Sequence, residues 1–394
     1  MTLPPAPWQT DPDMRRLLGV LGAPEGETRF VGGCVRDTLL GITVADIDLA
    51  TRLQPQDVMD RLKAAHIKAV PTGIAHGTVT AVIHGRPVEV TTLRRDVATD
   101  GRRATIAYTG DWAEDAARRD FTINALSADP DSGELFDYFG GLDDLHARTV
   151  RFIGDPLIRI AEDHLRILRF FRFHARFGAG HPDAAGLDAC TARANDLMAL
   201  SRERIADELL KLLALPDPAP TIALMLERGI LKPVLPELAD AALLADLVLR
   251  ERAADVAPDA LRRLAALLPA DPKVAEDIAA RLRLSKKAGK KLVAVAGRTP
   301  SDRADGPALA YRIGREEAVD RLLLIGEAEA ARGLAGWQRP HFPLTGGDLI
   351  AMGLPPGPAV AKTLQAIERE WIACGFHGDA AAVREMAKEM LPEG

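Results

Sequence analysis

Two aspartates, Asp46 and Asp48, carry the clearest chemical signal in the sequence. In a strand over residues 45–50, alternate side chains share a face, so both carboxylates are expected on one face while Ile47 and Leu49 point into a core. Two carboxylates held side by side repel each other unless a cation lies between them, and hard oxygen ligands of this kind suit Mg²⁺. We therefore predict that Asp46 and Asp48 bind metal; a half-exposed edge strand with a polar face is the alternative.

A phosphate-binding turn is expected just upstream. Residues 28–31 should form a strand that leads into Gly32, Gly33 and Arg36, and a helix is expected over residues 37–40. Adjacent glycines remove the side chains that would keep the backbone away from a phosphate, and a helix start presents free N–H groups. Arg36 adds positive charge at the same place. A tight turn without a ligand is the simpler interpretation of the two glycines by themselves.

Three further charged residues are candidates for the same site. Residues 78–84 and 87–92 have the pattern of paired strands, with Glu89 on their polar face. Glu89 is either a third carboxylate near the metal or a cross-strand partner for an arginine. Arg119 is suited to neutralising phosphate charge, and Asp120 to orienting that arginine or supporting the metal.

A row of charges marks residues 155–178, which are predicted to form one long helix. Asp155 suits the N-cap, Pro156 the first helical position, and Gly178 a left-handed residue that closes the helix. At 1.5 Å per residue the helix would be roughly 30 Å long. One flank of the helical wheel carries Glu162, Asp163, Arg166, Arg169 and Arg172. This flank is either a simple solvated face or a surface for an extended charged partner.

Other elements would position these residues. We expect a loop over residues 94–113 with Arg102 and Arg103 at its tip, a helix over residues 118–126 that enters the core, and a short strand over residues 135–138. The strand runs into a Gly-Gly pair that is expected to form a tight turn. Beyond residue 178 the pattern is helical almost throughout.

The fold class that follows is α+β. Strands and helices are mixed in the N-terminal part, and the pattern beyond residue 178 is helical. A basic cluster lies in this helical remainder, at Arg281, Arg283, Lys286, Lys287, Lys290 and Lys291. The cluster is either a phosphate-contacting patch or a solvated helical turn.

Composition narrows the setting. The 394-residue chain has a net charge of −6, so contact with RNA must come from local basic clusters. Cys34, Cys190 and Cys374 lie far apart, which argues against a disulfide framework or a zinc site. The N-terminal residues have neither the charge nor the apolar run of a targeting signal, and no run has transmembrane length. We expect a reducing cytoplasm.

In this order, the motifs resemble those of the bacterial-type (class II) CCA-adding tRNA nucleotidyltransferases and the related poly(A) polymerases. The matching residues are Gly32-Gly33-x-Val35-Arg36-Asp37, Asp46-x-Asp48, Arg118-Arg119-Asp120-Phe121-Thr122-x-Asn124-Ala125, Gly140-Gly141-x-x-Asp144-Leu145 and Glu162-Asp163-x-x-Arg166-x-x-Arg169-x-x-Arg172-Phe173. Cys34 and His164 depart from the motifs only at positions whose side chains are not expected to take part in the chemistry.

The resemblance implies a mixed α/β head over residues 1–150, with a sheet like that of DNA polymerase beta. A helical neck over residues 151–215 and a helical body and tail over residues 216–394 would follow. It implies transfer of C, C and A to the 3′ end of tRNA from CTP and ATP, without a nucleic-acid template. Asp46 and Asp48 would hold two Mg²⁺ ions roughly 3.5–4 Å apart. Gly33, Arg36 and Arg119 would contact the phosphates. The partner would be the acceptor end of tRNA, with no role for DNA or a membrane.

Base selection is also implied by the resemblance. Asp163 would accept a hydrogen bond from the base and Arg166 would donate one, with Arg169 and Arg172 as further nucleotide-binding residues. Cytosine and adenine both offer an exocyclic amine to a carboxylate, whereas uracil and guanine present a carbonyl there.

Three alternatives remain at this stage. A poly(A) polymerase would share every motif, although this chain lacks a basic, arginine-rich terminus. A CC-only enzyme is disfavoured because residues 100–103 resemble the loop of full CCA-adding enzymes. A non-catalytic RNA-binding protein would not need intact Asp46 and Asp48.

Overall fold

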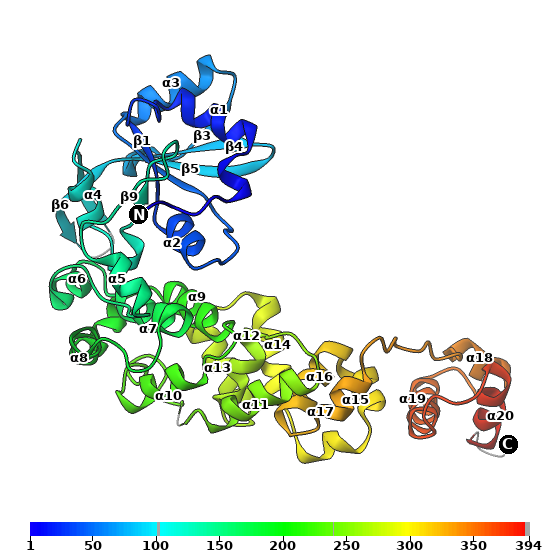
Figure 1. Ribbon diagram of the computed structural model, residues 1–394. Coiled ribbons are helices and arrows are strands. Elements are labelled where there is room, and N and C mark those ends of the chain that lie inside the picture. The colour runs from blue at the N-terminus through cyan, green and yellow to red at the C-terminus, as the bar shows by residue number, and fades with distance from the viewer. Residues whose placement is uncertain (101–102, 239, 391–394) are drawn as a thin grey trace. The chain divides into compact units, whose positions relative to one another are not determined.

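A computed structural model of the protein describes residues 1–100, 103–238 and 240–390. A seven-stranded mixed sheet, in the order β3-β4-β5-β2-β1-β8-β9, forms the centre of the N-terminal part (Figure 1). The strands, including the separate β6-β7 pair, are β1 Thr28–Val31, β2 Asp48–Thr51, β3 Lys68–Gly73, β4 Thr78–Ile83, β5 Arg86–Thr92, β6 Arg94–Asp100, β7 Arg103–Tyr108, β8 Ser127–Ala128 and β9 Leu135–Phe136.

The strand that carries the catalytic candidates lies in the middle of this sheet. β2 pairs antiparallel with β1 and parallel with β5, so it is not an edge strand. It begins at Asp48, and Asp46 precedes it in irregular backbone, whereas the sequence predicted one strand over residues 45–50. Leu49 is fully buried as expected. The central position holds Asp48 firmly and leaves Asp46 on a less constrained segment.

Helices of the N-terminal part pack against the sheet. α3 lies against β3 and β4 and also contacts α1, while α2 lies against β1 (Figure 1). The helices that belong wholly or in part to the first compact unit are α1 Pro12–Val20, α2 Gly33–Leu39, α3 Pro55–Ala64, α4 Trp112–Ala117, α5 Gly141–His146, α6 Pro156–Glu162, α7 Arg166–Phe177, α8 Ala184–Ala192, α9 Arg202–Leu213 and α10 Ala219–Glu227. The last residue of α9 and residues 219–223 of α10 belong to the second unit. α2 therefore begins at Gly33, four residues earlier than predicted.

Two predictions for the head are wrong. The predicted loop over residues 94–113 contains the antiparallel hairpin β6-β7. Of the two arginines expected at the tip of that loop, Arg102 lies outside the described residues and Arg103 is the first residue of β7. The predicted helix over residues 118–126 is a 3₁₀ turn, Thr122–Asn124, that leads into β8. The predicted pair β4-β5 is confirmed.

The long helix predicted over residues 155–178 is two helices, α6 and α7, separated at Asp163. The start is as expected, because the Asp155 carboxylate accepts from the backbone N of Leu157 at 2.7 Å. At the break, Asp163 is extended, with φ −153°. Gly178 is extended as well, with φ −76° and ψ 165°, so it does not close α7 in a left-handed conformation.

Aromatic packing fixes α7 against the head. Phe170 of α7 stacks on Phe152 with ring centroids 5.5 Å apart, and Phe173 lies 5.2 Å from Phe121. Phe121 and Phe170 are fully buried. Burying side chains of this size contributes roughly 1.5–3 kcal/mol each. α7 is therefore a fixed part of the same packed body as the sheet.

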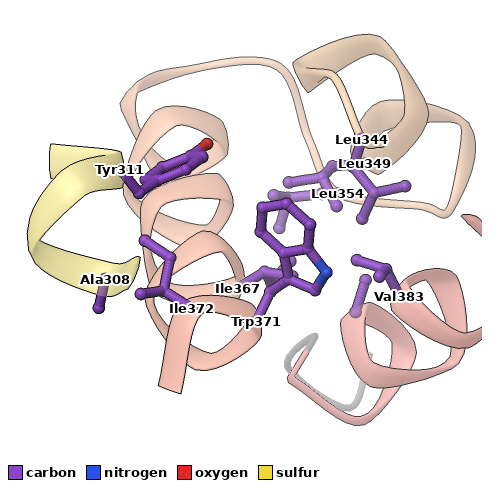
Figure 2. Close-up of a cluster of buried hydrophobic side chains, with 10 residues drawn as sticks. Ala308, Tyr311, Leu344, Leu349, Leu354, Ile367, Trp371, Ile372 and Val383 are labelled. Carbon is purple, nitrogen blue, oxygen red and sulfur yellow. The ribbon is translucent and has the colours of Figure 1, made fainter. Parts of the chain in front are cut away.

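The second compact unit is helical over the residues that the structure describes. Its helices are α11 Ala242–Ala253, α12 Ala260–Ala266, α13 Pro272–Arg281, α14 Lys286–Ala296, α15 Gly306–Ile313, α16 Arg315–Leu324, α17 Ala328–Gly333, α18 Gly346–Ala351, α19 Pro358–Ala373 and α20 Ala380–Met390. At its C-terminal end, Trp371 of α19 lies at the centre of a small core with Leu349 and Val383 (Figure 2). Tyr311 of α15 meets Trp371 edge-on, with ring centroids 5.9 Å apart.

The first unit comprises residues 1–212 and 224–234, and the second comprises residues 213–223 and 235–394. The finer subdivision at residues 150 and 215 stays a prediction. Among the described residues, no helix has both the length and the apolar composition that a membrane span requires.

Candidate active site

Asp48 lies in a concentration of negative charge. Its register partner on β5 is Glu89, and Asp46 precedes it by two residues. Burial raises the pKa of the Asp48 carboxyl to about 6, and the charges of Glu89 and Asp46 raise it too, while Arg119 opposes them. The site therefore holds more negative charge than its own residues neutralise.

These carboxylates suit a cation. In the described part of the chain, no basic side chain forms an ion pair with Asp46, Asp48 or Glu89. Among the described residues Glu89 thus has no arginine partner. Its position beside Asp48 fits the other predicted role, a third carboxylate near the metal. Uncompensated carboxylates of this kind fit a hard divalent ion, which is bound through oxygen.

Asp48→Asn is expected to raise the melting temperature of the metal-free protein near pH 8, where wild-type Asp48 is ionised. Between pH 3.8, the ordinary pKa of the carboxyl, and pH of about 6, Asp48 binds a proton in the folded state but not in the unfolded chain. Wild type therefore loses stability as the pH rises through this window, and the variant does not. Thermal unfolding with a chelator, at several pH values, measures the difference. A difference that is absent above pH ~7 would contradict the assignment of this charge cluster.

A second acidic group lies on other residues of the head. Among the described residues, one set of three candidate ligands, Asp11, Asp13 and His84, has atoms that all lie within 4.8 Å of one another. His84 Nε2 is 2.5 Å from an Asp13 carboxylate oxygen, and Asp11 accepts from the backbone N of Asp13 at 3.0 Å, as the N-cap of α1. His84 is well exposed, so an ordinary surface ion pair and a helix cap account for these contacts.

The glycine turn has one constrained and one open position. Gly32 has φ +68°, and a Cβ there would lie 2.9 Å from Nη1 of Arg119. Gly33 begins α2, and the nearest atom to a Cβ there would be an Arg36 nitrogen at 3.7 Å. Gly32 is therefore required by the backbone and by Arg119, while the backbone at Gly33 remains approachable.

Arg36 is buried within protein contacts. Its Nε and Nη2 donate to Asp37 at 2.8 and 2.6 Å, and its Nη1 donates to the side chain of Asn124. The guanidinium lies 4.1 Å from the ring centre of Phe177. Burial lowers the pKa of Arg36, although Asp37 partly offsets this. A contact with phosphate would require Arg36 to exchange some of these bonds.

Arg119 is the predicted phosphate ligand whose charge acts on Asp48. Its Nη2 donates to Asp115 at 3.3 Å, and its Nη1 to the carbonyl of Asn124 at 3.4 Å. These contacts hold the guanidinium beside the glycine turn. Arg119 thus adds positive charge beside the Asp48 carboxylate.

The arginines of α7 are paired with carboxylates. Arg169 donates from Nε to Asp120 at 2.7 Å, and Arg172 donates from Nε to Glu208 of α9 at 2.6 Å. Burial alone would raise the pKa of Asp120, but Arg169 and Asn124 hold it below its ordinary value. Asp120 therefore orients Arg169, whereas the sequence suggested Arg119 or the metal.

Asp163 and Arg166 have different surroundings although they are one turn apart. One carboxylate oxygen of Asp163 accepts from the backbone N of Leu165 at 3.1 Å, and the other from Arg204 at 2.8 Å. Arg166 forms an ion pair with Glu162 and donates to the carbonyl of Arg118 at 3.1 Å. One oxygen of Asp163 thus takes part in a partly exposed ion pair that a ligand could replace. Arg166 is bound to two protein groups, Glu162 and the carbonyl of Arg118.

Three residues of this network were missed by sequence reasoning: Asp115, Arg204 and Glu208. Asp115 precedes Arg118 and Arg119 by three and four residues, a spacing that brings side chains together on a helix, so it could have been found. Arg204 and Glu208 pair with residues 41 and 36 positions away, and no local pattern signals that pairing.

Comparison with known proteins gives consistent matches. Residues 28–151 match the family model described as poly A polymerase head domain, and residues 183–242 match one described as probable RNA and SrmB-binding site of polymerase A. The mitochondrial CCA tRNA nucleotidyltransferase 1 of Danio rerio is 36% identical, over 88% of this chain and 83% of that protein. The CCA-adding enzyme of Lacticaseibacillus paracasei is 32% identical, over 97% and 98%.

A solved structure of similar fold is the CCA-adding enzyme of Bacillus stearothermophilus in complex with CTP. It matches with a TM-score of 0.71 and 25% sequence identity, over 96% of this chain and 99% of that one. The match extends over the sheet and the helical remainder together.

Proposed function

This chain belongs to the family of CCA-adding tRNA nucleotidyltransferases, and we propose that it completes the 3′ end of tRNA with C, C and A from CTP and ATP, using Asp46 and Asp48 as its metal-binding carboxylates. The observation that carries the assignment of the site is the excess of negative charge around Asp48, which lies beside Glu89 and has its pKa raised to about 6. A cation bound there would relieve the repulsion among the three carboxylates.

The nucleotidyltransferase family and the carboxylates around Asp48, unpaired among the described residues, support a divalent metal ion as the cofactor. We propose that the ion is Mg²⁺, held by Asp46 and Asp48, because carboxylate oxygens are its preferred protein ligands. When bound, such an ion supplies positive charge to the phosphates and favours ionisation of a nearby hydroxyl. Glu89 is placed to add a third carboxylate to the same set.

The residues of the chain then position the reactants. Transfer requires the 3′-hydroxyl of the RNA to attack the α-phosphorus in line while pyrophosphate leaves, so the protein needs no nucleophile of its own. Arg119 neutralises charge on the triphosphate, and the open backbone of Gly33 lets a phosphate approach. Arg36 stabilises the glycine turn through its hydrogen bonds to Asp37 and Asn124, and it can contact a phosphate only if one of these bonds is broken.

Base selection falls to the start of α7. We propose that Asp163 accepts from the exocyclic amine of cytosine or adenine and that Arg166 donates to the neighbouring ring nitrogen. Asp163 would then exchange its ion pair with Arg204 for the base. Arg169 and Arg172 keep α7 in place through Asp120 and Glu208, and they add positive charge beside the nucleotide.

The test is an addition assay on a tRNA that ends before its CCA, with CTP, ATP or both, and products separated at single-nucleotide resolution. The expected products are two added nucleotides with CTP alone and three with both. A poly(A) polymerase would extend the RNA with ATP alone, and a CC-only enzyme would stop after two additions with both nucleotides. No extension under any condition would indicate a non-catalytic RNA-binding protein and overturn the proposal.

Five residues of the basic cluster in the body divide into two that form ion pairs and three that form none with a described residue. Arg281 pairs with Glu237 at 2.7 Å, and Lys291 with Asp259 at 2.7 Å. The exposed Lys286, Lys287 and Lys290 of α14 form no ion pair with any described residue. Two of these three lysines, Lys286 and Lys290, line a hollow of about 480 Å³ beside α13. We propose that these three lysines contact tRNA phosphates.

Changing all three lysines to glutamine is expected to flatten the salt dependence of tRNA binding. Each lost phosphate contact reduces the slope of log K against log salt by ~0.9, because fewer counterions are released. KM for tRNA should rise while kcat stays unchanged. Lys273→Gln is the control, since Lys273 is already paired with Glu276 and Asp277. An unchanged slope in the triple variant would mean that this is a solvated helical turn.

The three cysteines, which are free, favour a reducing compartment. Cys34 and Cys190 are buried and Cys374 is exposed. We propose the cytoplasm, while relatives such as the Danio rerio protein are named as mitochondrial. Fractionation of the native cells distinguishes the two.

A further inference from the structure

Asp115 of α4 is a buried carboxylate that the proposed chemistry does not use. It is 3% exposed. One oxygen accepts from the backbone N of Arg94 at 3.2 Å and from Nε of Arg118 at 2.9 Å, and the other accepts from Nη2 of Arg119 at 3.3 Å. Arg94 is the first residue of β6. A single carboxylate thus joins the base of the β6-β7 hairpin to two consecutive arginines.

The charge of Asp115 is maintained by these partners. Burial would raise the pKa of the Asp115 carboxyl, but Arg118 and Arg119 outweigh burial and hold the pKa below its ordinary value. A charged acceptor binds a guanidinium roughly twice as strongly as a neutral one. Asp115 is therefore a fixed and charged attachment point for Arg119.

Arg119 has few other attachments. The remaining hydrogen bond of its side chain to a described residue is the 3.4 Å contact from Nη1 to the carbonyl of Asn124. On another side the guanidinium abuts Gly32, where a Cβ would lie 2.9 Å away. This placement brings the charge of Arg119 to bear on Asp48. Without Asp115, one long hydrogen bond would have to hold a long, flexible side chain.

We propose that Asp115 is a positioning residue for nucleotide transfer, holding the guanidinium of Arg119 where the triphosphate binds. The proposal rests on the phosphate-binding role proposed above for Arg119. Asp115 touches neither substrate nor metal in this account, and it acts only through the arginine. Its loss should therefore weaken recognition of the phosphates and leave recognition of the base and sugar unchanged.

A double-mutant cycle tests this on the full chain. Binding of CTP and of CMP is measured by calorimetry in the presence of Mg²⁺. The proteins compared are wild type, Asp115→Asn, Arg119→Gln and the double variant. The readout is the ratio of the dissociation constants for CMP and CTP. Arg119→Gln should lower the preference for CTP over CMP about tenfold, as for the loss of one charge-assisted contact. Asp115→Asn should lower it by a similar factor. The double variant should lose no more than Arg119→Gln alone, because residues that act through one another are not additive.

Two further variants separate positioning from stability. Asp111→Ala removes the cap of the same helix, a 2.7 Å bond from the backbone N of Ala113 to the Asp111 carboxylate, and should lower the melting temperature without changing the ratio. Asp115→Glu should restore part of the CTP preference, and it replaces Asp115→Asn in the cycle if the amide variant does not fold.

The outcomes are distinguishable. Additive losses in the cycle, or a lowered ratio in Asp111→Ala of the same size, would overturn the positioning role. If Arg119→Gln lowers the ratio and both Asp115 variants leave it unchanged, only the role of Asp115 is overturned. An unchanged ratio in Arg119→Gln would instead remove the proposed role of Arg119 itself, and the role of Asp115 with it.

Discussion

Asp46→Ala and Asp48→Ala are each expected to abolish nucleotide addition while tRNA binding survives. Each change removes a carboxylate that we propose to bind the metal, and the loss should exceed the roughly 10²- to 10³-fold effect of deleting a single transition-state donor. The fold should persist, because Asp46 is exposed and Asp48 carries an unfavourable charge in the metal-free protein. Single-turnover addition of CTP to tRNA, with tRNA binding measured separately, provides the comparison.

The control is Asp131→Ala, which removes a half-exposed carboxylate of the same head that pairs with Arg15 at the surface. It should retain full activity, since a surface ion pair contributes little. Glu89→Gln should give a smaller loss than either aspartate variant if Glu89 only supports the set. Addition that persists in Asp46→Ala or Asp48→Ala would refute the metal assignment.

Much of the head could be predicted because its signals are local. The pair β4-β5 alternates apolar and polar residues around a turn at Gly85, and β1 ends where the two glycines begin. Register then brings Asp48 beside Glu89, which alternation on one polar face had suggested. Alternation along the strands was enough to place Asp48 and Glu89 on one sheet, but it also predicted that Asp46 lies in β2, whereas Asp46 precedes this strand.

The break between α6 and α7 could not be predicted from local sequence. No proline or glycine lies between Pro156 and Gly178, so helix propensity favours a continuous rod. The break follows from distant contacts: Arg204 binds Asp163 across 41 residues, and Arg166 reaches the carbonyl of Arg118 across 48. Tertiary hydrogen bonds of this kind override a weak local preference.

The β6-β7 hairpin was missed for a different reason. Residues 94–108 are rich in charged residues and lack the alternation that marks an apolar face, and the two strands pair only with each other. Strand prediction depends on such a face. Asp115 was likewise overlooked because a carboxylate beside two arginines resembles an ordinary helical ion pair until its burial is known.

Asp163→Ala is expected to raise incorporation of UTP and GTP relative to CTP and ATP by one to two orders of magnitude. A carboxylate accepts from the amine of cytosine or adenine and repels the carbonyl that uracil and guanine present at the same position. Such a contact discriminates by about 1–3 kcal/mol, and each 1.4 kcal/mol corresponds to about a factor of ten. Single-turnover incorporation of all four nucleotides by wild type and variant gives the ratios.

Matched variants show whether the effect belongs to the carboxylate. Arg204→Gln removes the 2.8 Å partner of Asp163 but keeps the acceptor, so it should blur selectivity only mildly. Arg166→Ala should weaken the binding of all four nucleotides more than it reduces the selectivity among them, because it removes a positive charge. It also leaves Glu162 and the carbonyl of Arg118 without this partner at the break before α7. If Asp163→Ala leaves the four rates in wild-type proportion, the start of α7 does not select the base, and selection must be sought elsewhere in the head.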